Sequence, residues 1–348
     1  MQIGVGLDAR LGLSFEEQAA LSREAAEQGY TSIWTPDGAG NDGFQLCAMR
    51  WQASTDVVPE GLGTGISVSP VAFRSPVSFA SSAGTLSQMT GGKFSLGIGT
   101  GGIYQPSTRR NIGFRTQSSL AVMRDYLITT RKLLAGETVD YEGEAVTLRG
   151  MGIPGFRNAP KTPVLLGALG PKMLALAGEL SDGAAMNWCN TERVHWSREQ
   201  VNEGARAAGR DPSELQLVEY IRVSVDEDVT VARNALAQAT MGYALRATVP
   251  TERERQFAYR GHFERMGFTD ELLALDEMRK KDATQDELIA AFPDALLDAV
   301  GVYATPAEAQ AKFEALAEGL DTAIVRVVNA RPGIDSTRAV MQACAPGK

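Results

Sequence analysis

The chain has 348 residues, of which 44% are hydrophobic and 22% charged, a composition typical of one large globular unit or two modest ones. Its net charge is −8 and it contains no basic run, which argues against a broad nucleic-acid surface. It also has no apolar run of the roughly 18 residues that span a bilayer, and its first residues lack the pattern of a signal peptide. A local phosphate site stays compatible with the charge, because a few backbone amides can bind an anion.

Cysteine and histidine are both scarce. The three cysteines, Cys47, Cys189 and Cys344, are far apart and odd in number, which argues against a disulfide framework and favours a reducing cytoplasm. The two histidines, His195 and His262, are too few for a His-rich metal centre. We therefore expect a cytoplasmic protein without a metal, although carboxylates alone could hold a weak magnesium site.

Short apolar segments alternate with helical patterns along the chain. We expect strands at residues 3–7, 31–35, 62–68, 94–98, 164–166, 184–187, 215–225 and 323–328. We expect helices at residues 15–28, 44–54, 76–89, 117–134, 172–180, 193–208, 230–248, 307–318 and 336–343. Two insertions, at about residues 136–162 and 249–295, interrupt the alternation. The first carries a hairpin signal around Glu142 and Gly143, and the second is charged and irregular.

This alternation predicts an α/β fold. Near-continuous apolar strands, such as AIVRVV near the C-terminus, are typical of a parallel sheet covered by helices. The alternative, a doubly wound open sheet, ordinarily has fewer units and a glycine-rich turn after its first strand, which GLDARLG does not supply. We therefore expect residues 1–348 to form one (β/α)8 barrel, a TIM barrel, with two insertions that cover its mouth.

The candidate site lies where the strands end, because active sites of such barrels occupy the C-terminal face. Two strand ends are rich in glycine, Gly97 to Gly102 and Gly167 to Gly170, and glycine lets a ligand approach the backbone closely. Gly170-Pro171 opens a helix whose free amides, with Lys172, can bind a phosphate. The alternative, that these glycines only make tight turns, fits the two motifs equally well.

Gly65 lies inside the third predicted strand, where glycine often marks a bulge or a close backbone approach. A crowded barrel interior that needs a small residue explains it equally well. The segment alone leaves both interpretations open.

Longer segments carry a more specific signal. The run GTGISVSPVAFRSPVSFASSAGTLSQMTGGKFSLGIGTGG, residues 63–102, resembles the third-to-fourth strand region of the luciferase-like family. PVLLGALGPKMLALAGELSDGAAMNW, residues 163–188, is similar to that family's fifth-to-sixth strand region, and EEQAALSREAAEQGYTSIWTPD extends the resemblance towards the N-terminus. Within the family the chain looks most like the deazaflavin-dependent branch, which includes methylenetetrahydromethanopterin reductase.

The resemblance implies a pocket for a deazaflavin or isoalloxazine ring at the strand ends, with coenzyme F420 favoured over FMN. In this family a non-prolyl cis peptide commonly forms a bulge behind the ring, and the matching bond is Gly65-Ile66. The implied phosphate contacts fall on Gly167 to Gly170, in agreement with the helix start described above. The full set of implied cofactor contacts is Asp37, Gly65, Ile66, Ser67, Gly99, Thr100, Gly101, Gly167, Ala168, Leu169, Gly170 and Asn187.

One departure from the family concerns proton transfer. Many relatives have Asp-His after the second strand, where the histidine can donate a proton, but this chain has Asp37-Gly38. Asp37 is then the candidate catalytic residue. His195 falls in a predicted helix and is expected to be structural, and His262 lies in the second insertion without an assignable role.

Other side chains near strand ends have two interpretations each. They can contact substrate or cofactor, or they can be packing or surface residues. They are Trp34, Arg74, Tyr104, Arg109, Arg110, Trp188, Glu219 and Tyr220.

We hypothesise an F420-dependent oxidoreductase that transfers a hydride between the deazaflavin and a small organic substrate, the protein supplying position and electrostatics. The alternatives are an FMN-dependent monooxygenase of the same fold, a flavin-binding protein without turnover, and an unrelated barrel hydrolase or lyase. The last would need convergent carboxylates or a lysine at the strand ends, which the sequence does not place there. The expected partners are a small-molecule substrate and further copies of this chain, as a homodimer or higher homo-oligomer, with no nucleic acid or membrane.

Overall fold

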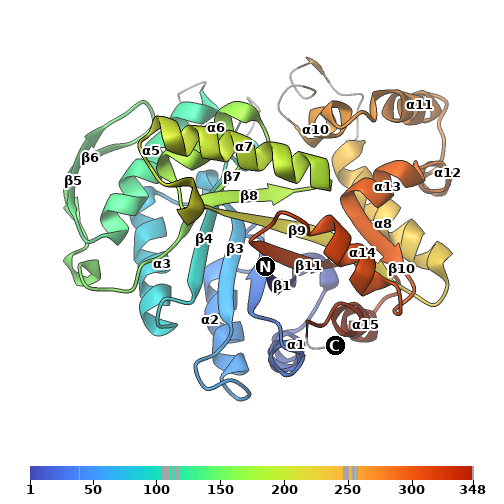
Figure 1. Cartoon of the computed structure of the whole chain (residues 1–348), viewed down its shortest axis with the longest axis horizontal. Helices are drawn as coiled ribbons and strands as arrows, with labels where there is room; N and C mark the ends of the chain where they lie inside the picture. Colours follow the sequence, from blue (N-terminus) through green and yellow to red (C-terminus); the bar gives the residue numbers. More distant parts are fainter. Residues whose placement is uncertain are drawn as a thin grey trace.

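Eight parallel strands close into a barrel in the computed structural model, which describes residues 1–38, 40–103, 110, 113, 118–245, 251–252, 255 and 258–346. Each strand pairs with the next around the ring, and β9 closes the ring by pairing with both β8 and β11 (Figure 1). In ring order the strands are β1 (Gln2–Gly6), β2 (Ser32–Thr35), β3 (Gly63–Pro70), β4 (Phe94–Gly99), β7 (Val164–Gly167), β8 (Gly183–Asn187), β9 (Gln216–Val225) and β11 (Thr322–Val327).

Helices surround this barrel and bury their apolar faces against the outside of the strands (Figure 1). Several begin at side-chain caps: Ser14 and Glu17 form a capping box at α1, and Asp42 caps α2. The helices that follow the strands are α1 (Phe15–Glu27), α2 (Gly43–Ser54), α3 (Pro76–Met89), α5 (Ser119–Leu134), α6 (Pro171–Leu180), α7 (Thr191–Ala207), α8 (Val229–Ala244), α14 (Ala309–Leu316) and α15 (Ile334–Ala343).

The inside of the barrel is filled by large aromatic rings that face glycines. Trp34 and Tyr220 pack there with aliphatic side chains of β7, β8, β9 and β11. A Cβ atom on Gly65 would overlap the indole ring of Trp34. A Cβ atom on Gly6 would lie 2.7 Å from Cε1 of Tyr220. The crowded-interior interpretation of Gly65 therefore accounts for that residue.

The two insertions lie at opposite ends of the molecule's long axis (Figure 1). The first forms the hairpin β5 (Thr138–Glu142) and β6 (Thr147–Gly152), which is held to α5 by Asp125. Phe156, just after the hairpin, packs on Gly84 of α3, and Gln88 at the end of α3 donates to Gly155. Because α3 and α5 end beside the amino-terminal ends of the strands, this insertion lies away from the barrel mouth. The expectation that it covers the mouth is wrong.

The second insertion is helical rather than irregular. It contains α10 (Tyr259–Arg265), α11 (Thr269–Lys280), α12 (Gln285–Ala290) and α13 (Asp294–Val300), which share an apolar cluster with α8. A short strand, β10 (Gly301–Ala304), follows and pairs with the C-terminal end of β9. The sequence pattern did not indicate these elements, because each is short and its charged residues interrupt the apolar spacing.

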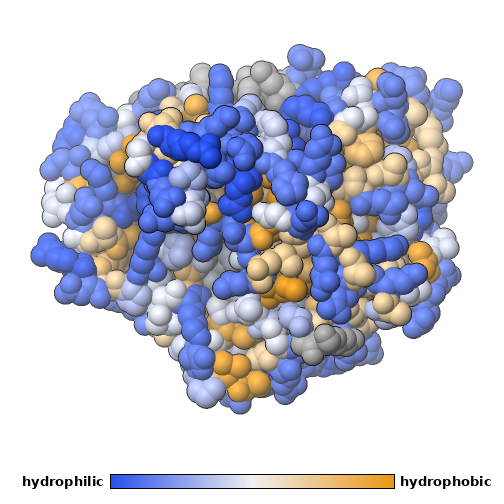
Figure 2. Space-filling model, viewed as in Figure 1, coloured by the Kyte–Doolittle hydropathy of each residue, from blue (hydrophilic) through white to orange (hydrophobic). Residues whose placement is uncertain are grey.

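The (β/α)8 barrel predicted from the sequence is confirmed, since every predicted barrel strand and flanking helix is present with its ends moved by a few residues. Cys47, Cys189 and Cys344 are buried, and none of the three forms a disulfide. In the part of the chain that the structure describes, no helix combines the length and apolar composition needed to cross a bilayer. The face shown in Figure 2 is mostly hydrophilic, with scattered apolar side chains.

We predict that Gly65→Ala lowers the free energy of unfolding by about 1–3 kcal/mol, because the added methyl group overpacks the interior against Trp34. Gly242→Ala is the matched control: Gly242 lies in α8 with open space around its Cα, so alanine should raise stability by up to about 1 kcal/mol. Chemical denaturation of the three proteins measures both changes. Equal effects of the two substitutions on the free energy of unfolding would show that Trp34 does not restrict the size of the side chain at position 65.

Candidate active site at the barrel mouth

Strand β3 is irregular where it reaches the mouth of the barrel, the face formed by the carboxyl ends of the eight strands. Thr64–Ile66 pair in register with β4, and the register shifts before Ser69. The cis peptide bond lies between Ser67 and Val68. Its predicted position, Gly65-Ile66, is therefore wrong, because both of those residues still pair regularly with β2 and β4.

The side chain of Val68 lies over bare backbone of two neighbouring strands. A Cβ atom on Gly99 would lie 2.6 Å from Val68 Cγ2, and one on Gly97 or Gly167 would lie 3.1 or 3.3 Å from Val68 Cγ1. Val68 itself stays partly exposed. Because β4 and β7 carry no side chains here, Val68 forms a low, apolar floor on this side of the mouth.

The loop between β7 and α6 offers unpaired amides beside that floor. The Ala168 amide donates to the Ala185 carbonyl at 3.2 Å, but the amides of Leu169 and Gly170 have no partner among the described residues. Gly170 is the N-cap of α6 and supplies no side-chain acceptor to the helix start. Free amides at the positive end of a helix dipole are suited to bind a phosphate, as the sequence predicts.

The loop after β4 turns tightly at its start. The Ile103 amide donates to the Thr100 carbonyl at 3.0 Å, and Gly101 has a φ of 53°, in the left-handed region that favours glycine. Thr100 and Gly101 thus lie at the mouth beside Gly99 and can approach a ligand with their backbone. Tyr104 and Arg109 lie outside the described residues.

Asp37 uses both carboxylate oxygens within the protein. Its Oδ2 accepts a hydrogen bond from Ser69 Oγ at 2.6 Å, and its Oδ1 accepts one from the Gly43 amide at 3.2 Å. Arg74 Nε lies 3.6 Å from Oδ2, and Arg74 also pairs with Asp42. Asp37 therefore ties the end of β2 to the bulge of β3 and to the start of α2, and its contact with a cofactor stays a prediction.

On the opposite side of the mouth, Asn187 is fixed by two side-chain hydrogen bonds. Its Oδ1 accepts from Arg222 Nη1 at 2.6 Å, and its Nδ2 donates to Tyr259 Oη at 2.8 Å. The Arg222 guanidinium lies 3.4 Å from the ring centre of Trp188 and 5.2 Å from that of Tyr243. Burial, together with repulsion from Arg326, lowers the pKa of Arg222 to about 9.

Trp188 adopts an uncommon backbone conformation directly after β8. Its φ is 63°, a region that costs a non-glycine residue about 1–3 kcal/mol and that tends to occur at functional sites. The ring is fully buried between Arg222 above and the edges of Tyr243 and Phe263. The Trp188 ring therefore packs beneath Arg222 and holds it in place at the mouth, whereas Trp34 is part of the barrel core.

Arg326 of β11 forms an ion pair beside Arg222. Arg326 Nη2 lies 2.5 Å from Asp8 Oδ2, and its guanidinium covers the ring of Tyr220 at 4.9 Å. Burial alone would raise the pKa of Asp8, but the pairing with Arg326 lowers it. Asp8, Arg222 and Arg326 thus form the charged part of the mouth.

Behind the mouth, His262 attaches α10 to the segment that follows β8, next to the buried Glu219 of β9. His262 Nε2 donates to the Trp188 carbonyl at 2.7 Å, and the Cys189 amide donates to Glu219 Oε1 at 2.7 Å. Burial lowers the pKa of His262 to about 4 and raises that of Glu219 to about 8, so both are mainly uncharged at neutral pH. These contacts place the second insertion at the mouth. By contrast, His195 is exposed on α7 near Glu318, as expected of a surface residue.

The mouth arginines and two of its tyrosines were not predicted from the sequence. Arg222 and Arg326 occur inside apolar runs, EYIRVS and AIVRVV, at positions of the same parity as the inward-facing Tyr220 and Ile324. An arginine at an inward position near a strand end was therefore a usable signal. Tyr243 and Tyr259 come from α8 and α10, and no pattern along the chain brings them to β8 and β9.

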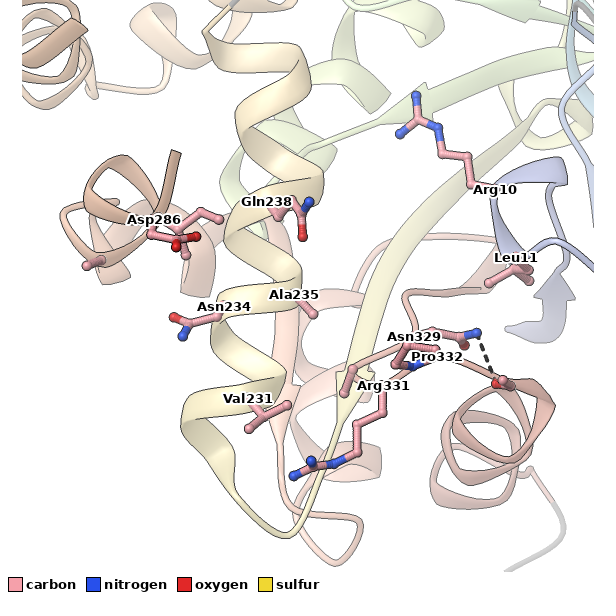
Figure 3. A pocket seen from close by; sticks show the side chains of 14 residues that line it. Arg10, Leu11, Val231, Asn234, Ala235, Gln238, Asp286, Asn329, Arg331 and Pro332 are labelled. Atoms are coloured by element: carbon pink, nitrogen blue, oxygen red, sulfur yellow. Dashed lines mark hydrogen bonds between the residues drawn. The ribbon is translucent and has the colours of Figure 1, made fainter. Parts of the chain in front are cut away.

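A pocket of about 700 Å³ lies beside the carboxyl ends of β1, β9 and β11. Figure 3 shows Arg10 extending from the short helix η1 (Ala9–Leu11) towards α8. The guanidinium of Arg10 also lies 5.5 Å from the ring centre of Tyr243. The pocket is lined by residues of α8, α12 and the loop after β11, and its polar members besides Arg10 are Asn234, Gln238, Asp286, Asn329 and Arg331.

Comparison with known proteins agrees with this architecture. The profile of the family described as luciferase-like monooxygenase matches residues 1–323. The 5,10-methylenetetrahydromethanopterin reductase of Methanolobus tindarius is 27% identical over 322 residues, 90% of each chain. A Mycobacterium tuberculosis protein that its name assigns to the coenzyme F420-dependent oxidoreductases is 28% identical over 86% of this chain and 88% of its own. The solved structure of the F420-dependent tetrahydromethanopterin reductase of Methanopyrus kandleri superposes with a TM-score of 0.75 at 20% identity, covering 99% of this chain and 97% of its own.

We predict that Glu219→Gln changes how stability depends on pH. The folded-state pKa of Glu219, about 8, exceeds the ordinary value of 4.5, so its contribution to stability is complete below pH 4.5 and is lost as pH rises towards 8. Relative to Glu219→Gln, the wild type should lose up to about 1.4 kcal/mol of unfolding free energy per pH unit between pH 5 and 8. Denaturation at several pH values measures the difference in unfolding free energy between the two proteins. The contribution of His262 to the pH dependence cancels in this difference, because both proteins contain His262.

The control is Glu199→Gln, which changes an exposed glutamate of α7 and should leave the pH dependence as in the wild type. Parallel pH profiles of wild type and Glu219→Gln would mean that the buried carboxyl titrates near its ordinary pKa.

Proposed function

The chain belongs to the luciferase-like monooxygenase family and is an enzyme, and from this premise we propose that it binds coenzyme F420 and transfers a hydride between the deazaflavin and a small organic substrate. The names of the Mycobacterium tuberculosis relative and of the Methanopyrus kandleri reductase both support the choice of F420. The cofactor supplies the carbon that carries the hydride, and the protein supplies binding, orientation and electrostatics.

The observation that carries the proposal is the combination of the low, apolar floor formed by Val68 with unpaired amides on the same side of the mouth. A planar ring would rest on the partly exposed side chain of Val68, which lies over the backbone of Gly99 and Gly167. The residues around the bulge, Gly65–Ser67, would lie behind the ring. Thr100 and Gly101 would border it, and the free amides of Leu169 and Gly170, next to Ala168, would hold the phosphate of the tail.

Asp37 and Asn187 would fix the edges of the ring. Each is held by hydrogen bonds to neighbouring strands or helices, so its orientation is set before the cofactor binds. Gly38 leaves no side chain where relatives carry a proton-donating histidine. The hydroxyl of Tyr243 is a candidate to hold a proton at the mouth: burial would raise its pKa, but Arg222, Arg326 and Arg10 together lower it.

The experiment that tests the proposal is a parallel titration of the purified apoprotein with F420 and with FMN, followed by fluorescence and ultrafiltration. Tight binding of F420 alone is the expected result. A preference for FMN would favour the second candidate, an FMN-dependent monooxygenase, which the family description supports. Binding of neither cofactor would overturn both, and bound F420 that exchanges hydride with no substrate would support a binding protein without turnover.

We also propose that the enzyme is a homodimer or higher homo-oligomer in the cytoplasm, as expected from the sequence. Analytical ultracentrifugation of the purified protein tests the first statement, and a monomer at micromolar concentration would contradict it.

We predict that Gly170→Asp weakens F420 binding at least about tenfold without destabilising the fold. Aspartate is a preferred N-cap residue and has open space here, so α6 should gain stability, while the new carboxylate repels the phosphate that the loop would hold. Gly170→Ser is the matched control, because its hydroxyl caps the helix without a charge and should keep F420 affinity within about threefold of the wild type. Unchanged affinity in Gly170→Asp would place the phosphate elsewhere.

A further inference from the structure

Three guanidinium groups converge at the side of the mouth opposite the bulge. Arg222 lies on the inward face of β9 and is the direct strand-pairing neighbour of Arg326 in β11, and Arg10 follows β1. Two of them lie over the same ring, Arg222 at 5.2 Å and Arg10 at 5.5 Å from the centre of Tyr243. Arg326 is close enough to both Arg222 and Tyr243 to shift their pKa values.

Within the described residues, Asp8 is the carboxylate that forms an ion pair with this group of cations. Its Oδ2 accepts hydrogen bonds from Nε and Nη2 of Arg326 at 3.1 and 2.5 Å. Glu219 also lies near Arg222, but burial raises its pKa to about 8, so it is mainly uncharged at neutral pH. Neither Arg10 nor Arg222 forms an ion pair with a described carboxylate. The mouth therefore carries a surplus of positive charge on this side, although the whole chain has a net charge of −8.

Arg222 is the buried member of the three. It is 2% exposed, and its Nη1 is bound to the amide oxygen of Asn187. Its Nη2 forms no hydrogen bond of normal geometry among the described residues, and the hydroxyl of Tyr243 is a polar group near its guanidinium. A buried cation with an unused donor is costly unless an anion or acceptor pairs with it.

The position of the surplus charge fits a substrate rather than the cofactor tail. In the ring order of eight strands, β9 lies opposite β3 and β11 lies opposite β4. A ring resting on Val68 of β3 would expose its free face towards β9 and β11, with the substrate between the ring and the arginines. Arg10 is exposed and lines the pocket of Figure 3, so an anion can reach this side from solvent.

We propose that Arg222 and Arg10, with Arg326 behind them, form a subsite for an anionic group of the substrate, a carboxylate or a phosphate. Guanidinium forks bind both kinds of oxyanion through paired N–H donors. The assignment of this anion to the hydride-exchanging substrate rests on the proposed function, whereas the anion site itself does not. The substrate class is therefore organic acids or phosphate esters, held by the charged end with the reactive carbon over the ring.

The test is a titration of the full chain with inorganic phosphate and with benzoate, followed by calorimetry and by tryptophan fluorescence, to which Trp188 beneath Arg222 contributes. The wild type should bind at least one of these anions saturably. Arg222→Gln and Arg10→Gln should each lower the affinity about tenfold or more, as expected when a charge-assisted contact is lost. Arg23→Gln, the same change at a partly exposed arginine of α1, is the control and should keep wild-type affinity.

Circular dichroism checks that each variant is folded. Should Arg222→Gln not fold, Arg10→Gln decides, because Arg10 is exposed and its removal leaves no buried group without a partner. The absence of saturable binding by the wild type would overturn the proposal. So would equal affinity in the wild type and Arg10→Gln, or an equal loss in Arg23→Gln.

Repeating the titration with saturating F420 separates this proposal from the proposed function. Anion binding that persists beside bound F420 supports a substrate subsite. Displacement of phosphate by F420 in a one-to-one ratio would assign the arginines to the acidic tail of the cofactor and overturn the substrate subsite while keeping the cofactor. Phosphate binding without any F420 binding would keep the anion site and overturn the proposed cofactor.

Discussion

The packing of two large aromatic rings inside a closed eight-stranded barrel is the constraint on which the rest of the structure depends. A barrel of this size encloses only enough space for side chains to fill it. Trp34 and Tyr220 are the two aromatic residues of the interior cluster, and glycine is required where their rings approach a neighbouring strand. A Cβ atom on Gly4 would lie 2.9 Å from Trp34 Cδ1, and one on Gly6 would lie 2.7 Å from Tyr220 Cε1. The side chains inside the barrel are thus closely packed, and they form the base of the mouth.

Above these side chains the mouth has two unlike halves. On the side of β3, β4 and β7 the surface is apolar and low, because Val68 lies over glycine backbone. On the side of β9, β11 and β1 it is charged and rises to the aromatic rings of α8 and α10. Such a division suits the reaction proposed for this enzyme, since a flat ring needs an apolar support and its reacting partner needs polar anchors on the facing side.

The sequence predicts the barrel well because each strand is a nearly unbroken apolar run and each helix has a long apolar stripe. It predicts part of the site, because glycines and a helix start can be read from neighbouring residues. The cis bond is misplaced by two residues, since GTGISVSP has several small residues that could accommodate the irregularity. The links between Asn187, Arg222 and Tyr259 join residues far apart in the chain, and only the folded packing of α10 on β8 brings them together.

The attachment of α10 to the barrel has a consequence for how the mouth responds to salt. Asn187 meets Tyr259, and His262 meets the Trp188 carbonyl, through buried hydrogen bonds between uncharged groups. Dissolved ions screen such contacts far less than they screen exposed ion pairs, such as Arg198 with Asp321. Changes of ionic strength should therefore alter the attraction of charged molecules to the opening while leaving the cover over the opening in place.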